Sequence, residues 1–197
     1  MLNLRKEVFL FYGTYVLIYK HKDDIISHII RQGIGVHMII TFSRRYGTGA
    51  SIIAKAISEK YSLPIYGKEY FNNKCKGLSG TEYISAQKRI IQSLSKTPCI
   101  IMGRGASIAL KGNDDVINVY VMANKQDRIK RVMEKENITK EEAETRIKFV
   151  DSERIAFFEK STGELWGNLD NYNVVIDVSK LGIEKSISLL ERYIDRM

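Results

Sequence analysis

From residue 38 to the end of the chain, short apolar runs alternate with longer segments in which apolar positions recur at helical spacing. The runs are rich in β-branched residues, which favours buried strands, and they cover residues 38–42, 63–66, 99–102, 116–122 and 174–178. Helical patterns cover residues 52–61, 81–95, 126–137, 139–161 and 182–195. The polar, glycine-bearing stretch 71–81 predicts a loop. This alternation predicts an α/β fold in which helices flank a parallel sheet, joined by right-handed crossovers.

Residues 1–37 do not follow this alternation. Residues 8–19 are apolar and aromatic, too few to span a bilayer, and predict an appended strand or helix. Residues 23–32 predict a short amphipathic helix, and the three histidines His21, His28 and His37 are expected on a surface. We therefore expect an N-terminal extension, 1–37, and one domain, 38–197. Two alternatives stay open: a signal peptide, although no small-residue cleavage site follows, and a natural start at Met38 with an upstream start codon preceding it.

The first strand of the domain is followed by a tight turn that contains Gly47 and Gly49, and then directly by a helix. Strand, glycine loop and helix form the context of a phosphate-binding loop. Glycines let consecutive backbone N–H groups turn inward, and the first helical turn adds unpaired donors and a partial positive charge. The pattern therefore predicts an anion site.

The match to the Walker A pattern G-x-x-x-x-G-K-[ST] is incomplete. Gly49 takes the second glycine position and Ser51 the Ser/Thr position, but Arg44 replaces the first glycine and Ala50 replaces the lysine. Loss of the lysine removes the side chain that reaches the β- and γ-phosphates. Charge would have to come from Arg44, Arg45 or Lys55 nearby, and a purely structural turn is an equal alternative from the loop alone.

Composition and charge narrow the class of partner. The 197 residues suffice for one sizeable domain, and 31 basic against 23 acidic residues give a net charge of +8, which attracts anions. The basic residues are spread along the chain without a stripe interleaved with aromatics, so a nucleotide site is favoured over nucleic-acid binding. The two cysteines, Cys75 and Cys99, have neither metal-ligand nor disulfide-framework spacing, which is typical of a reducing cytoplasm.

Several arginines lie where a parallel sheet binds ligands. Arg104, between two glycines, directly follows the strand 99–102, and ligands bind beyond the carboxyl ends of such strands. Arg128 and Arg131 share a helix face near its N-terminal end, where cations oppose the helix dipole and an anionic ligand would compensate. Turns and solvated helix faces with arginines are the structural alternative.

The long helical segment 139–161 begins with a capping-box pattern, Thr139 followed by Glu142. Arg146 and Arg154 share one side of this helix, with Asp151 beside them as an orienting partner. Two arginines with a carboxylate between them would clamp a transferring phosphoryl group.

From Met38 onward the chain resembles the cytidylate-kinase-like family of P-loop proteins, relatives of nucleoside monophosphate kinases. The resemblance rests on the stretches ITFSRRYGTGAS, IIMGRGASIAL, VYVMANKQDRIKRVM and RIKFVDSERIAFF, and on the ending from GELWGNLD to ISLL. It implies a three-layer P-loop NTPase fold with a helical lid segment. It further implies that the donor phosphates of ATP lie on the loop residues Ser43, Arg44, Arg45, Gly47, Thr48, Gly49, Ala50 and Ser51.

The same resemblance implies roles for the remaining candidates. Ser51 would help to place Mg²⁺, Arg104 would hold the acceptor's phosphate, and catalytic charge would come from Arg128, Arg131, Arg146, Asp151 and Arg154. The implied reaction is transfer of the γ-phosphoryl group of ATP to CMP, dCMP or a related small acceptor. Few acceptor-gripping candidates stand between the second and third strands: Lys68, Glu82, Lys88 and Arg89. Core or interdomain packing, rather than base stacking, is expected for the aromatic residues Phe157, Phe158, Trp166 and Tyr172.

The alternative function is a catalytically weak or inactive nucleotide-binding protein, which Ala50 supports. The expected partner is a nucleotide or another small acceptor, without nucleic acid or membrane. We expect a cytoplasmic location, and a homodimer stays open.

Overall fold

The structure, a computed structural model, describes residues 7–11, 14–18 and 38–197, and the side chains of the last range only. The strands β1 (Glu7–Phe11) and β2 (Thr14–Ile18) pair antiparallel, with Glu7 opposite Ile18. Of the two conformations expected for residues 8–19, the strand is therefore the one found. The expected helix at 23–32 and the three histidines lie outside the described residues, and the proposed boundary after residue 37 stays a prediction.

The domain is built on a five-stranded parallel sheet with the order β4-β5-β3-β6-β7. In register, Ile39 of the central strand lies opposite Cys99 on one side and Val116 on the other. The strands are β3 (Ile39–Arg44), β4 (Ile65–Tyr66), β5 (Cys99–Met102), β6 (Val116–Met122) and β7 (Val174–Asp177). The predicted α/β class, the parallel sheet and all five strand positions are confirmed.

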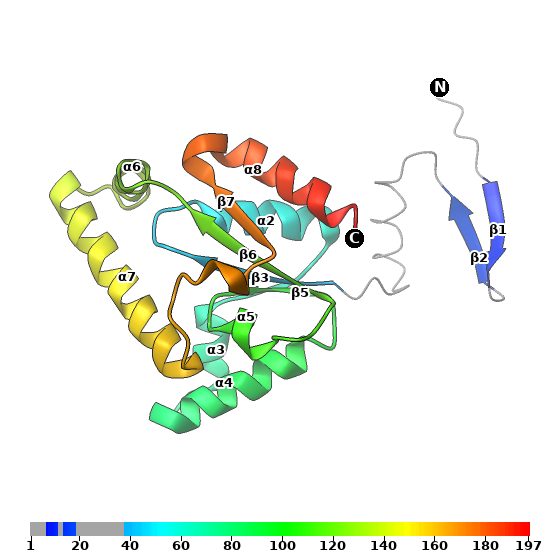
Figure 1. The fold of residues 1–197 in the computed structure, drawn as a ribbon, viewed down its shortest axis with the longest axis horizontal. Coiled ribbons are helices and arrows are strands. Elements are labelled where there is room, and N and C mark those ends of the chain that lie inside the picture. The colour runs from blue at the N-terminus through cyan, green and yellow to red at the C-terminus, as the bar shows by residue number, and fades with distance from the viewer. Residues whose placement is uncertain (1–6, 12–13, 19–37) are drawn as a thin grey trace.

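Helices cover both faces of this sheet and give three layers (Figure 1). On one face lie α2 (Ala50–Tyr61) and α8 (Val178–Ile194), and on the other lie α3 (Lys68–Lys74), α4 (Gly80–Leu94) and α5 (Ala106–Ala109). The remaining helices, α6 (Lys125–Glu136) and α7 (Lys140–Thr162), lie past the carboxyl end of β6 in Figure 1, and a short 3₁₀ turn (Leu169–Asn171) precedes β7. The expected lid segment is α7.

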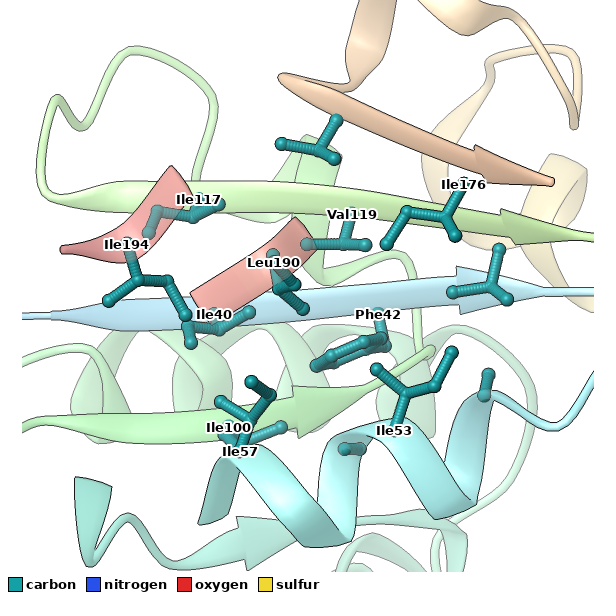
Figure 2. Packing of buried hydrophobic residues seen from close by; sticks show 14 of the residues in the cluster. Ile40, Phe42, Ile53, Ile57, Ile100, Ile117, Val119, Ile176, Leu190 and Ile194 are labelled. Atoms are coloured by element: carbon teal, nitrogen blue, oxygen red, sulfur yellow. The ribbon is translucent and has the colours of Figure 1, made fainter. Parts of the chain in front are cut away.

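Alternation along the strands explains why both faces are covered. Ile40 and Phe42 point to the α2–α8 face, where they meet Ile53, Ile57 and Leu190 (Figure 2). Strand residues at the alternate positions, such as Ile39, Cys99 and Ile101, point to the other face. There they form a second cluster with Phe71 and Ile91. Successive strand side chains point to opposite faces, so continuous apolar runs require a helix on each.

The loop predicted at 71–81 is wrong. Residues 68–74 form α3, α4 already begins at Gly80, and only the short stretch between them is not helical. The reason is burial of Phe71, which is 0% exposed in the second core cluster. Packing of this one ring overrides the weak helix propensity of the neighbouring Asn72 and Asn73.

Two helix starts illustrate local control by capping residues. Thr139 and Glu142 form the predicted capping box at the start of α7, with both reciprocal hydrogen bonds present. The predicted start of the last helix at residue 182 falls on a kink inside α8, because Gly182 has the non-helical angles φ 76° and ψ 168°. The short segment before the kink was not predicted, and Asp177 caps it by accepting from the amide of Ser179. In the part of the chain that the structure describes, no helix has the length and apolar character needed to cross a bilayer.

Candidate functional site

The glycine loop between β3 and α2 is packed closely against neighbouring elements. Gly47 and Gly49 have φ values of 78° and 85°, which L side chains rarely adopt. A Cβ on Gly47 would lie 2.7 Å from the carbonyl oxygen of Arg128, and a Cβ on Gly49 would lie 2.4 Å from Cδ1 of Ile183. Backbone conformation therefore favours glycine at both positions, and at Gly47 the contact with the backbone of α6 requires it as well.

The loop leads directly into the N-terminus of α2. Gly49 is the N-cap of α2, and its carbonyl oxygen accepts from the amides of Ile52 and Ile53 at 2.9 and 3.3 Å. The amides ahead of these two begin the helix without an intrahelical acceptor, and the helix dipole adds partial positive charge there. This geometry suits a phosphate group.

The residue at the lysine position of the loop is part of the hydrophobic core. Ala50 is 2% exposed and belongs to the main core cluster with Phe42 and Ile53. Ser51 is exposed at the second residue of α2.

Ser51 offers a hydroxyl oxygen beside the phosphate position, which fits Mg²⁺, an ion that prefers oxygen ligands and keeps several waters. Among the described residues, no group of three or more His, Cys, Asp and Glu side chains could hold a metal. A magnesium ion would therefore be held by Ser51, water and the phosphates of a nucleotide.

An arginine–aspartate pair behind the loop anchors its backbone. Nη1 of Arg128 lies 2.6 Å from Oδ2 of Asp151, and both side chains are largely buried. The same Nη1 donates to the carbonyl oxygen of Tyr46 at 3.2 Å, and the other Asp151 oxygen accepts from the amide of Tyr46 at 2.7 Å. The pair therefore joins α6, α7 and the loop.

Two further arginines lie on the α6–α7 side of the loop. Nη1 of Arg131 donates to the carbonyl oxygen of Gly47 at 3.3 Å. The Arg146 side chain is 50% exposed, and its Nε lies 3.4 Å from Oε2 of Glu136, whose Oε1 accepts from the Tyr46 hydroxyl.

A cavity of about 390 Å³ lies beside the loop, at the carboxyl ends of β3 and β5 and under α7, a volume typical of small-ligand sites. Four arginines line it: Arg146, which pairs with Glu136, and a group of three guanidinium groups, those of Arg44, Arg104 and Arg154. The other polar and aromatic residues in its wall include Ser43, Tyr46, Lys68, Phe149, Glu153, Phe157 and Trp166. Within residues 38–197, no ion pair engages any of the three guanidinium groups.

Backbone geometry aims Arg104 into this cavity. Gly103, Arg104 and Gly105 all have positive φ, at 77°, 64° and 66°, and such a conformation is costly for the arginine. The side-chain amide of Gln87 donates from Nε2 to the carbonyl oxygen of Arg104 at 3.0 Å, which stabilises the turn. The guanidinium carbon lies 4.8 Å from the centre of the Phe157 ring.

Arg154 reaches from α7 back to the loop. Its Nη1 donates to the carbonyl oxygen of Arg44 at 3.2 Å, and its guanidinium lies 5.3 Å from the centre of the Tyr46 ring. Arg154 thereby connects α7, which covers the cavity, to Arg44, where the glycine loop begins.

The three cations repel one another in a partly desolvated space. Burial, then the charges of Arg154 and Arg104, lower the pKa of Arg44 to about 9. Burial also lowers the pKa values of Arg104 and Arg154, although Asp151 opposes the shift for Arg154. An anion in the cavity would relieve this repulsion.

The structure thus separates the predicted site residues. Ser43, Arg44, Arg104, Arg146 and Arg154 line the cavity, whereas Arg128 and Asp151 lie behind the loop. Thr48 is buried, and its hydroxyl donates to the carbonyl oxygen of Arg45. Arg45 itself is exposed.

The acceptor candidates also separate. Lys68 lines the cavity, whereas Glu82 and Arg89 lie at a shallow surface site and Lys88 at a small pocket of about 70 Å³, too small for a nucleotide.

Sequence reasoning missed the aromatic wall of the cavity. Trp166 was expected in the core or between domains, and it lines the cavity instead, together with Phe149 and Phe157. Phe157 stands three residues after Arg154, so helical spacing alone places both on one face of α7.

Comparison with known proteins gives relatives that are matched over almost their whole length. The cytidylate kinase of Methanococcus vannielii is 29% identical over 175 residues, covering 80% of this chain and 99% of the relative. That of Methanocaldococcus jannaschii is 26% identical over 181 residues, covering 81% and 99%.

Solved structures agree. An uncharacterized protein from Eubacterium ventriosum superposes with a TM-score of 0.75 at 26% identity, over 81% of this chain and 99% of that one. Shikimate kinase from Bacteroides thetaiotaomicron, at 12% identity and a TM-score of 0.54, covers 80% and 98% and shows the kinase fold alone. The family model of the cytidylate kinase-like family matches residues 69–180, more than half of the chain, and this protein belongs to that family.

Proposed function

We propose that this protein is a phosphotransferase that moves the γ-phosphoryl group of ATP to CMP, dCMP or a related small acceptor. The observation that carries the proposal is the convergence of Arg44, Arg104 and Arg154 on one cavity beside a glycine loop. Two curated relatives with this fold are named cytidylate kinases, which supports a nucleoside monophosphate as the acceptor.

The two halves of the site suit the two substrates. Loop residues 43–51 and the N-terminus of α2 would hold the donor's phosphates, with Ser51 helping to place Mg²⁺, which would neutralise phosphate charge. Arg104 would hold the acceptor's phosphate, and the aromatic wall of Phe157 and Trp166 would contact its remaining body.

The chemistry needs positioning and charge more than covalent help. An oxygen of the acceptor's phosphate forms a bond to the γ-phosphorus, and the bond from that phosphorus to the bridging oxygen of ADP breaks. The electron pair stays on ADP, so the step needs no general base when the acceptor's phosphate is a dianion. Arg154, held by α7, would neutralise the charge that develops on the transferring group.

Arg128 and Asp151 act differently in this proposal from the roles that the family resemblance implied. They would position the loop through Tyr46, because their side chains are paired with each other behind it. Arg131 and Arg146 would supply charge at the edge of the site.

One observation favours the second candidate function, nucleotide binding without turnover. Ala50 replaces the lysine and is buried in the core.

The absence of nucleic-acid binding, a cytoplasmic location and a homodimer also stay predictions.

The test is phosphoryl transfer from Mg-ATP to CMP, dCMP, UMP, AMP and GMP, with Arg104→Ala in parallel. Turnover on one pyrimidine nucleotide, lost in the variant, is the expected result. ATP binding without turnover on any acceptor would favour the second function, and no ATP binding would reduce the glycine loop to a structural turn.

A further inference from the structure

The loop needs a cation for the donor's terminal phosphate, and the chain offers three near it. Ala50 stands where the lysine would be, so the charge must come from Arg44, Arg45 or Lys55 if it comes from this segment. The structure distinguishes among them by exposure and by partners.

Lys55 and Arg45 do not face the site. The Lys55 side chain is 74% exposed, lies on α2, and pairs with Glu59 on the next turn, with Nζ 3.6 Å from the carboxylate. Arg45 is exposed and is not among the residues that line the cavity.

Arg44 faces the site. It ends β3 at the position of the first loop glycine, and its side chain crosses to the turn after β5. A Cβ on Gly103 would lie only 2.5 Å from Nη1 of Arg44, so the guanidinium occupies the space that the glycine leaves. It therefore lies between the glycine loop and Arg104.

Two features make the Arg44 guanidinium suited to binding an anion. Within residues 38–197, no carboxylate forms an ion pair with Arg44, and Arg104 and Arg154 line the same cavity. Its backbone is fixed by Arg154, which donates to its carbonyl oxygen at 3.2 Å. A half-buried guanidinium without an ion pair, on a backbone held by Arg154, suits a phosphate, which it can bind with two parallel hydrogen bonds.

We propose, resting on the proposed function, that Arg44 replaces the missing lysine and binds the terminal phosphate of the donor where that phosphate meets the acceptor. Arg44 transfers no proton. It neutralises charge on the phosphoryl group from the side of the acceptor, whereas the loop amides hold the group from the other side. The positive charge that the Walker lysine provides at the start of α2 is thus provided by Arg44 at the end of β3.

The test compares the binding of Mg-ATP and Mg-ADP, measured by calorimetry without any acceptor. Arg44→Gln should weaken Mg-ATP about 10-fold or more and Mg-ADP less than about 3-fold, because only ATP carries the terminal phosphate. Arg44→Lys, which keeps the charge, should recover part of the loss. Lys55→Gln is the matched control that removes one cation from the neighbouring helix, and it should change neither affinity.

Five outcomes would overturn the assignment. Equal losses for ATP and ADP, or no loss in either Arg44 variant, would mean that Arg44 does not contact the terminal phosphate. Weaker CMP binding with unchanged ATP binding would place Arg44 on the acceptor. A selective ATP loss in Arg45→Gln or Lys55→Gln instead would transfer the role to that residue. If the wild type binds neither nucleotide, the proposed function fails as well, and this outcome differs from the others because they retain wild-type binding.

Discussion

The arginines near the backbone of residues 44–46 fall into two groups that differ in ion pairing. Behind the loop, Arg128 is 6% exposed and forms an ion pair with Asp151, and both also hydrogen-bond the backbone of Tyr46. In the cavity, Arg44, Arg104 and Arg154 face a shared space without an ion-pair partner in residues 38–197.

The difference separates structure from chemistry. A buried cation is tolerated when a carboxylate and hydrogen bonds compensate its desolvation, and such a pair then belongs to the fold. Cations without compensation reduce stability, and they are retained where a ligand supplies the missing charge. We therefore expect substitutions behind the loop to act on stability and substitutions in the cavity to act on activity.

The largest expected effect is loss of stability in Asp151→Asn. The change leaves the charge of Arg128 buried and unpaired, so the free energy of unfolding should fall by about 3 kcal/mol or more. Urea denaturation measures it, and Glu59→Gln, in the exposed pair with Lys55, is the control that should stay within about 0.5 kcal/mol of wild type. A loss in Asp151→Asn no larger than in the control would remove the contrast between the two groups.

The next effect tests the cavity group. Arg154→Ala should lower kcat about 100-fold or more by removing charge stabilisation of the transferring group, with a melting temperature near that of wild type. Steady-state kinetics on the accepted nucleotide and a thermal scan measure the two quantities. Lys148→Ala removes an exposed cation from the same helix and should leave both unchanged. A collapse of the melting temperature with Arg154→Ala would show that this arginine belongs to the structural group.

A backbone substitution tests whether the loop depends on the helix behind it. In Gly47→Ala the new methyl group would meet the carbonyl oxygen of Arg128, in addition to the strain of a positive φ, and we expect a loss of about 2 kcal/mol. Gly163→Ala is the matched control, because its φ is 73° but no atom lies within 4 Å of the added Cβ. Equal losses in a denaturation experiment would mean that strain alone acts and that the contact with α6 contributes nothing.

The smallest expected effect has the opposite sign. Without ligand, Arg44→Gln should raise the free energy of unfolding by up to about 1 kcal/mol, because one of three mutually repelling cations is removed. The pKa of Arg44 is lowered to about 9 in the fold, so the unfolded chain binds more protons above that pH. The wild type's deficit should therefore be complete below pH 9 and shrink as the pH rises further. A variant less stable than wild type at pH 7 would mean that Arg44 stabilises the fold.

Several features followed from local sequence alone. Apolar runs predicted all five strands of the sheet, and the Thr139–Glu142 pattern predicted the start of α7. Gly47 and Gly49 predicted the tight turn before α2, and both have positive φ in it. These features depend on the order of residues within a few positions, which is why a sequence shows them.

Other features depended on residues far apart in the chain. The interpretation of 71–81 as a loop failed because Phe71 is buried by a distant cluster, and Trp166 was expected in the core rather than in the cavity wall. Helical spacing placed Arg146 and Arg154 on one side of α7, but it could not show that Asp151 forms its ion pair with Arg128.

By itself, the sequence determined the α/β architecture, the position of the glycine loop and the set of arginines available for chemistry. Only the tertiary structure decided which of those arginines are paired, and hence which of them are free to bind an anion. The physical reason is that pairing and burial are set by groups 23 positions apart in the chain, as in Arg128 and Asp151, or 110 apart, as in Arg154 and the carbonyl oxygen of Arg44. Residue type sets the charge of a side chain, and the folded environment sets whether that charge is already compensated.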